Sequence, residues 1–157
     1  MNIIDLYRKK KNLSGIRKAA AVVFLLFWVA FIWHNSMEGA GMSGIRSIRI
    51  TNAVNGLLWE GMAVTEHAVR KLAHFLEYAV EGILTVFLFW AFKISVRKDV
   101  YAGMLLGVMT ALIDETIQLF SAGRDGAVGD VWIDLGGFVL GFSLSALWIV
   151  FRRRMNG

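Results

Sequence analysis

Ionisable side chains recur every three or four positions inside a stretch that is apolar enough to cross a membrane. In "RKLAHFLEYAVEG" (70–82), His74, Glu77 and Glu81 share one face of a predicted helix, because residues at this spacing lie on the same side. An imidazole and two carboxylates on one face can exchange protons, bind a divalent cation or hold a polar ligand. Each charged group inside a span costs at least about 2.5 kcal/mol on insertion scales, so compensating contacts or a function are expected.

Two further apolar stretches, 100–120 and 131–151, carry polar faces of the same kind. The polar groups of the first lie in its last turns and those of the second at its start, next to the connection between them. Because polar faces are costly against lipid, we expect these faces to turn toward one another and toward the face of 70–82. The predicted pocket residues are Arg70, His74, Glu77, Tyr78, Glu81, Asp114, Glu115, Gln118, Arg124, Asp130 and Asp134.

The composition is that of an integral membrane protein. Apolar residues make up 57% and charged residues 18% of the 157 residues, whereas soluble domains are about half apolar and about a quarter charged. The mean hydropathy is +0.57. A helix needs about 20 apolar residues to cross the hydrocarbon. We therefore expect an all-α fold in one domain over 1–157, an integral bundle of about four transmembrane helices near 19–36, 72–92, 100–120 and 131–151.

Lysine and arginine concentrate on one side of this arrangement. The leader, the connection 93–99 and the tail together carry 12 of the 17 basic residues. The positive-inside rule therefore predicts a multi-pass protein of the cell membrane with both termini cytoplasmic. The net charge of +5 then has anionic lipid as its partner, and nucleic-acid binding is not expected. The first stretch also has the basic leader of a signal peptide, but no A-x-A site follows, so we expect a retained anchor.

The long connection between the first two spans contains an amphipathic stretch. From Ile50 to Met62, apolar residues fall at the spacing of one helical face. We expect an outer helix that lies on the membrane surface or across the outer ends of the spans. A small extracellular subdomain is the alternative. In either case the predicted pocket lies in the outer half of the bilayer and opens to the outside.

Three charged residues at the rim of the predicted pocket are expected to have local roles. Arg124 is the only arginine in its connection and is predicted to pair with Asp114, Glu115 or Asp130. Lys71 is expected to anchor the helix at the interface, and a helix cap is the alternative role of Asp130.

Three motifs resemble the VanZ-like membrane protein family: "RKLAHFLEY" (70–78), "DETIQLF" (114–120) and "GRDGAVGDVWIDLGGFVLG" (123–141). They stand in the family's order and cover most of the C-terminal half, whereas the N-terminal half matches in outline only. The resemblance implies a set of characteristic polar positions that includes Lys71 but not Glu81. These positions are Arg70, Lys71, His74, Glu77, Tyr78, Asp114, Glu115, Gln118, Arg124, Asp130 and Asp134. Many members carry Asn where this chain has Asp134. The founding member is associated with resistance to the glycopeptide teicoplanin, so the resemblance implies a membrane location and a link to antibiotic resistance, but no reaction.

The favoured function is a pocket that binds an amphiphilic cell-envelope lipid or lipoglycopeptide at the outer leaflet, with low-level teicoplanin resistance as a consequence. The alternative is an intramembrane enzyme acting on a lipid-linked cell-envelope substrate. The chain has no cysteine and no recognisable serine signature, so such an enzyme would need another nucleophile. A divalent ion bound by the weak metal candidates His74, Glu77, Asp114 and Asp134 would activate water. The sequence alone names no cofactor.

Transport and a purely structural role are two further candidate functions. Proton or cation transport needs polar groups beyond Glu81, where Thr85 alone offers a hydroxyl in that span. A purely structural role, in which the acidic residues pair with Arg70, His74 and Arg124 to hold helices together, stays open.

Overall fold

The computed structural model describes residues 3–58, 63–96, 98–124 and 126–155. Its helices follow one another along the chain as α1 (Ile3–Met37), α2 (Ala40–Asn55), α3 (Glu66–Phe92), α4 (Val100–Leu119) and α5 (Val128–Met155). No strand occurs among the described residues. The predicted all-α fold is confirmed.

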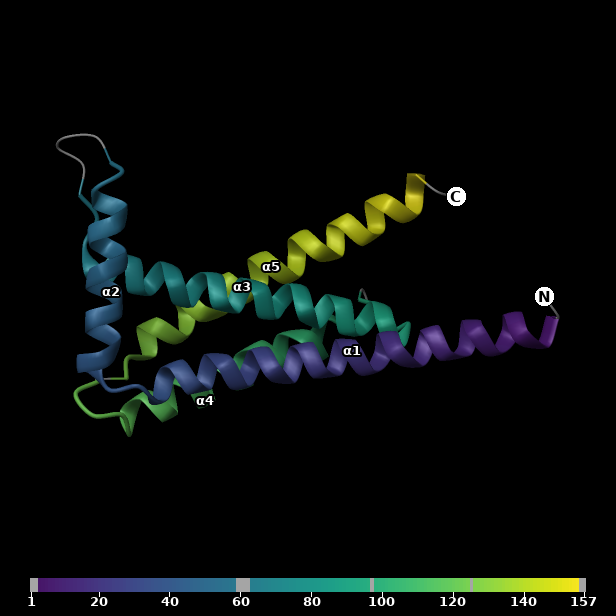
Figure 1. Ribbon diagram of the computed structural model, residues 1–157, viewed down its shortest axis with the longest axis horizontal. Coiled ribbons are helices and arrows are strands. Elements are labelled where there is room, and N and C mark those ends of the chain that lie inside the picture. Colours follow the sequence, from purple (N-terminus) through teal and green to yellow (C-terminus); the bar gives the residue numbers. More distant parts are fainter. Residues whose placement is uncertain (1–2, 59–62, 97, 125, 156–157) are drawn as a thin grey trace.

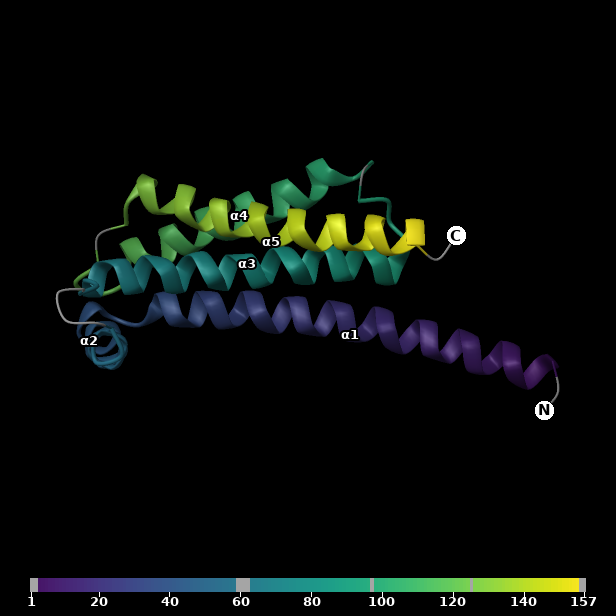
Figure 2. The ribbon, with the colours of Figure 1, turned by 90° about the horizontal axis from the view of Figure 1, so that it is seen from above.

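Four of the helices are long and apolar enough to cross a membrane. These segments are Asn12–Met37, Glu66–Phe92, Val100–Leu119 and Val128–Arg152. Their outward surfaces carry many exposed large apolar side chains, as expected where a helix contacts lipid. Figures 1 and 2 show the two termini at the same end of the bundle, away from α2. An even number of crossings therefore leaves both ends of the chain on one side of the membrane.

Helix α2 lies across the other end of the bundle, at a steep angle to the long helices (Figure 1). An outer helix was predicted, but it lies earlier in the sequence than the amphipathic stretch indicated. The residues that α2 buries are Ser43, Ser47 and Thr51, at a spacing of four. Its inner face is therefore polar, and the apolar pattern that starts at Ile50 does not mark the buried side. Gly61 and Met62, at the end of the predicted face, lie outside the described residues.

The most extensive contact between helices joins α3 and α5 (Figure 2). Gly82 of α3, and Gly137 and Gly141 of α5, each lie directly against the backbone of the facing helix. An added Cβ at any of these positions would overlap that backbone, so only glycine permits the observed approach. Gly137 and Gly141 stand four residues apart in the sequence, the spacing of a small-xxx-small motif, whereas Gly82 has no such partner four residues away.

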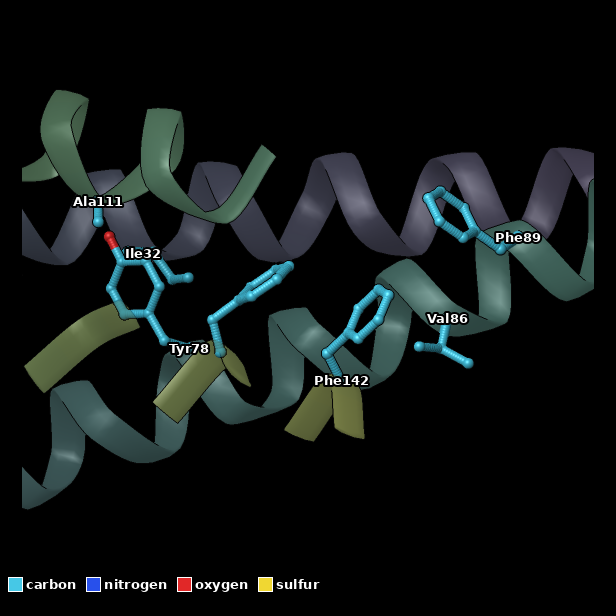
Figure 3. Packing of buried hydrophobic residues seen from close by; sticks show 7 residues of the cluster. Ile32, Tyr78, Val86, Phe89, Ala111 and Phe142 are labelled. Atoms are coloured by element: carbon cyan, nitrogen blue, oxygen red, sulfur yellow. The ribbon is translucent and has the colours of Figure 1, made fainter. Parts of the chain in front are cut away.

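An apolar core fills the bundle on the terminal side of the polar residues. The rings of Phe138 and Phe142 stack with centroids 5.9 Å apart, and Phe142 meets Phe89 edge to face at 6.2 Å. Tyr78 marks the boundary, because its ring belongs to this cluster and its hydroxyl points toward Ala111 of α4 (Figure 3). The bundle is therefore polar at the α2 end and closed by aromatic rings beyond it.

Candidate functional site

All but one of the predicted pocket residues belong to the half of the bundle next to α2. They occupy the first turns of α3, the last turns of α4, the start of α5 and the connection between α4 and α5, whereas Glu81 lies just past the middle of α3. Because α3 and α5 run away from α2 while α4 runs toward it, these segments meet at one level. The polar faces therefore converge at the end of the bundle that carries α2.

A cavity of about 330 Å³ opens at this level, and we refer to it as the polar cavity. Its walls come from α3, α4, α5, the first residue of α2 and the connection between α4 and α5. Most of the predicted pocket residues lie in these walls. The lining residues are Ala40, His67, Arg70, Lys71, His74, Glu115, Gln118, Gly123, Arg124, Ala127, Asp130, Ile133 and Asp134.

A second, smaller cavity of about 140 Å³ lies on the other side of His74, toward α1 and α2. It shares Arg70, His74 and Arg124 with the polar cavity, and Glu77 lies in its wall. Two arginines therefore face both polar spaces. Of the remaining predicted residues, Tyr78, Glu81 and Asp114 line neither cavity and are buried.

One ion pair at the rim joins α3 to α5. The Nζ atom of Lys71 lies 2.8 Å from Oδ1 of Asp130, and both side chains are about one-third exposed. Lys71 was expected to act as an interfacial anchor; its pairing with Asp130 adds a contact between helices that this expectation did not include. Asp130 lies inside the first turn of α5, where a negative charge also faces the positive end of the helix dipole. This pair fixes the start of α5 beside α3.

The predicted ion pair of Arg124 is not found. Its Nη2 donates to Oγ of Ser43 at 2.7 Å, and among the described residues no carboxylate oxygen is within ion-pair distance. The prediction failed because its candidate partners are engaged elsewhere: Glu115 accepts from the backbone N–H of Ala127 at 2.9 Å, and Asp130 pairs across the helices.

The charge of Arg124 is held in an unfavourable setting. Burial, and then the nearby charge of Arg70, lower the pKa of the Arg124 guanidinium. Like charges that face one cavity repel each other, and an anion placed between them removes that repulsion. The two arginines therefore give this part of the polar cavity a positive charge.

Deeper in the bundle, one histidine faces two aspartates from two other helices. The Nδ1 atom of His74 lies 3.9 Å from Oδ2 of Asp114 and 3.8 Å from Oδ1 of Asp134. Asp114 is 0% exposed and Asp134 is 1% exposed. Gln118 donates from Nε2 to Oδ2 of Asp114 at 3.0 Å, one turn along α4. Three spans thus supply one side chain each to this buried cluster.

Glu77 lies apart from the buried cluster. Its Oε1 accepts from Nδ2 of Asn35 at 3.1 Å, at the end of α1. The sequence suggested that His74 and Glu77 could form an acid–base pair, but the carboxylates that face His74 are those of the two aspartates. Of the four weak metal candidates, His74, Asp114 and Asp134 therefore lie together, and Glu77 lies outside this group.

Two contributors to the site were missed by the sequence reasoning, namely the end of α1 and the whole of α2. Asn35 contacts Glu77, and Ser43 contacts Arg124. Arg46 pairs with Glu38 and donates to Oδ1 of Asn35 at 3.4 Å. The polar segment "HNSMEGAG" that follows the first span was a visible signal, but no spacing rule relates it to residues on other helices.

An apolar groove of about 380 Å³ lies between α4 and α5, and we refer to it as the α4–α5 groove. It shares Glu115 and Ala127 with the polar cavity, so the two spaces adjoin. Its other lining residues are mainly aliphatic. They are Val108, Leu112, Thr116, Leu119, Gly126, Val128, Val131, Trp132 and Leu135.

Comparison with known proteins gives one match. The sequence model of the VanZ/LLP1 family matches residues 21–151, a range that contains every candidate site residue. No curated protein and no solved structure matches the chain.

Proposed function

The chain belongs to the VanZ/LLP1 family, and on that premise we propose that it binds an anionic amphiphile of the cell envelope from the outer leaflet. The polar cavity holds the head group, and the α4–α5 groove holds the acyl chain. The protein resides in the cell membrane with both termini in the cytoplasm, so that the cavity opens outward. The ligand class comprises envelope lipids and lipoglycopeptides with a phosphate or carboxylate head group, and low-level teicoplanin resistance is a consequence of such binding.

The observation that carries this proposal is the pair of arginines at the cavity. Arg70 and Arg124 both line it, the charge of Arg70 disfavours that of Arg124, and Arg124 has no carboxylate partner among the described residues. Arg70 has Glu66 at the ion-pair limit of 3.9 Å. Guanidinium groups bind carboxylate and phosphate oxygens through paired N–H donors. An anionic head group would therefore satisfy both side chains at once.

The groove supports an amphiphile rather than a small anion. Because it adjoins the polar cavity through Glu115 and Ala127, a ligand with its head in the cavity can lay its tail against aliphatic side chains. Burying a methylene group is worth about 0.8 kcal/mol in water-to-apolar transfer, although a tail taken from the bilayer gains less. The head group therefore supplies selectivity, and the groove sets the orientation of the ligand.

The alternative prediction, an intramembrane enzyme that acts on a lipid-linked envelope substrate, is favoured by one specific observation. The cluster of His74, Asp114 and Asp134 lies next to the cavity that would receive the head group. Head-group binding is the first step of either function, so the same binding experiment applies to both.

The test compares lipids that differ in head-group charge. Purified protein in a non-ionic detergent is titrated with lysophosphatidylglycerol and, separately, with zwitterionic lysophosphatidylcholine of the same chain length. We expect the anionic lipid to bind more tightly. Arg70→Gln and Arg124→Gln should each weaken it by about tenfold or more, since a hydrogen bond to a charged group is worth about 1.5–3 kcal/mol. Equal binding of the two lipids by the native chain would refute the proposal.

Arg49→Gln is the matched control. Arg49 is an exposed arginine on α2 that lines none of the described cavities, so its replacement removes the same charge without touching the site.

In cells, expression should protect growth against teicoplanin more than against a glycopeptide that lacks a lipid tail. The Arg70→Gln/Arg124→Gln double variant should lose this difference at matched protein levels.

A further inference from the structure

The cluster beneath the polar cavity has the composition of a metal site. Its three members offer one imidazole nitrogen and two carboxylate oxygens, all within 4.8 Å of one another. Zn²⁺ and related divalent ions bind these donor types, typically with three protein ligands at sites that keep one position open. Each ligand stands on a different helix, so the site is held by the packing of α3, α4 and α5 rather than by one flexible loop.

The distances between the donor atoms fit a shared ion better than direct hydrogen bonds. The separations of 3.8 and 3.9 Å from His74 Nδ1 to the aspartate oxygens exceed the roughly 2.9 Å of an N–H···O bond. Tetrahedral ligands at about 2.1 Å from Zn²⁺ lie about 3.4 Å apart. Small side-chain rotations would therefore bring the three donors to coordinating distance.

The surroundings leave the charge of the aspartates uncompensated. Asp134 is 1% exposed, and neither of its carboxylate oxygens has a hydrogen-bond partner among the described residues. Among the described residues, no lysine or arginine lies within ion-pair distance of Asp114 or Asp134, and the nitrogen that pairs with both is that of His74. A buried carboxylate without partners is strongly unfavourable, whereas a divalent cation balances two of them.

From these observations we propose that His74, Asp114 and Asp134 bind one divalent transition-metal cation, Zn²⁺ in the first instance, at the floor of the polar cavity. The imidazole ligand favours Zn²⁺ over Mg²⁺ and Ca²⁺, which prefer sites made of oxygen alone. Gln118 holds Asp114 in position through its bond to Oδ2, as second-layer partners of metal ligands commonly do.

The open side of the site faces the polar cavity, because His74 and Asp134 line the cavity and Asp114 does not. A phosphate or carboxylate oxygen of the head group could complete the coordination there, while Arg70 and Arg124 hold the other oxygens. This role in head-group recognition rests on the proposed function, whereas binding of the metal alone does not.

The experiment measures metal binding in the absence of lipid. The full chain, purified through a tag without histidine and stripped with EDTA, is incubated with ZnCl₂, separated from free metal and assayed by mass spectrometry of the element. We expect about one Zn²⁺ per chain, and no comparable retention of Mg²⁺. Asp134→Asn should lower the Zn²⁺ affinity by at least about tenfold, the minimum effect of disturbing even a second-layer partner.

Asp99→Asn is the matched control, because it makes the same change at an exposed position just before α4 that lines none of the described cavities. His34→Gln is a second control, since His34 is exposed near the end of α1 and is not one of the three ligands. Both variants should bind Zn²⁺ as the native chain does. Equal losses in Asp134→Asn and Asp99→Asn would overturn the assignment.

A measurement on the native chain covers the case in which Asp134→Asn does not fold. Co²⁺ in place of Zn²⁺ should give visible absorption bands of a low-coordinate site with nitrogen and oxygen ligands, and excess Zn²⁺ should remove them. The absence of such bands, together with no retained Zn²⁺, would overturn the metal site even if lysophosphatidylglycerol binds normally. Retained Zn²⁺ without lipid selectivity would instead refute the proposed function and leave the metal site standing.

Discussion

Replacing Gly141 by alanine should separate the two helices that hold most of the polar residues. An added Cβ would lie 2.7 Å from the carbonyl carbon and 2.9 Å from the Cα of Ala79, whereas ordinary contacts begin at 3.4 Å. The obstructing atoms are backbone, so no side-chain rotation can relieve the overlap. Helix α5 must therefore move away from α3 by a substantial fraction of an ångström.

The expected cost can be estimated from its parts. Overpacking typically costs about 1–3 kcal/mol, and the upper end applies because two rigid backbones collide. Alanine recovers up to about 1 kcal/mol of helix propensity relative to glycine. The net loss is then about 2 kcal/mol, which corresponds to a fall in Tm of roughly 4–8 °C for a chain of this size.

Gly136→Ala provides the matched control on the same helix. A Cβ at Gly136 would lie 3.6 Å from Cε2 of Phe75, an ordinary contact, so this variant should be as stable as the native chain or slightly more stable. Thermal unfolding in detergent, followed by circular dichroism, compares the two. If Gly141→Ala and Gly136→Ala unfold at the same temperature, the close approach of α3 and α5 described above is wrong.

Two further predictions address topology and the role of the acidic residues. A cysteine at position 122 should react with a membrane-impermeant reagent in intact cells, and one in the connection between α3 and α4 should not; the reverse pattern would invert the assigned orientation. Glu77→Gln and Asp114→Asn should fold normally, because the amides keep the size and most hydrogen bonds, but lose ligand binding and protection against teicoplanin. Glu81→Gln should have a milder effect, since Glu81 lines neither cavity and, unlike Asp114, does not belong to the cluster around His74; full function of the Glu77 and Asp114 variants would favour a purely structural role.

The spans and their polar faces were predictable because both depend on local periodicity. Residues three or four apart share a helix face whatever the rest of the fold does, so His74, Asp114 and Asp134 could be assigned to inward faces from spacing alone. The cost of exposing such faces to lipid then required them to meet. The structure places these three side chains together, as that reasoning expected.

Contacts between elements were not predictable in the same way. The bond between Arg124 and Ser43 depends on how α2 lies across the bundle, and the bond between Asn35 and Glu77 depends on the rotation of α1 about its axis. Neither quantity leaves a periodic signal in the sequence. The partners predicted for Arg124 were chosen because they are close to it along the chain. One of them, Glu115, instead accepts a hydrogen bond from the backbone N–H of Ala127.

The requirement for glycine at position 82 was likewise not predictable from the sequence. A single glycine in an apolar helix has no spacing that marks it, whereas Gly137 and Gly141 form a pair that does. Only the facing backbone of α5 reveals that Gly82 is required. The small-residue motif on α5 therefore indicates that a close helix contact exists, but it does not identify the glycine on the facing helix α3.

The aromatic layer beneath the site limits how a ligand can reach it. A Cβ at Gly103 or Gly107 would strike the ring of Phe142 or Phe138 respectively, so α4 lies directly on these rings. Phe89 closes the third side by its edge-to-face contact with Phe142. The buried hydroxyls of Thr85 and Thr110 at this level donate to backbone carbonyls of their own helices, so they are not free to bind a moving ion, which argues against transport across the bundle. For the proposed ligand we therefore expect entry and exit at the α2 end and through the α4–α5 groove.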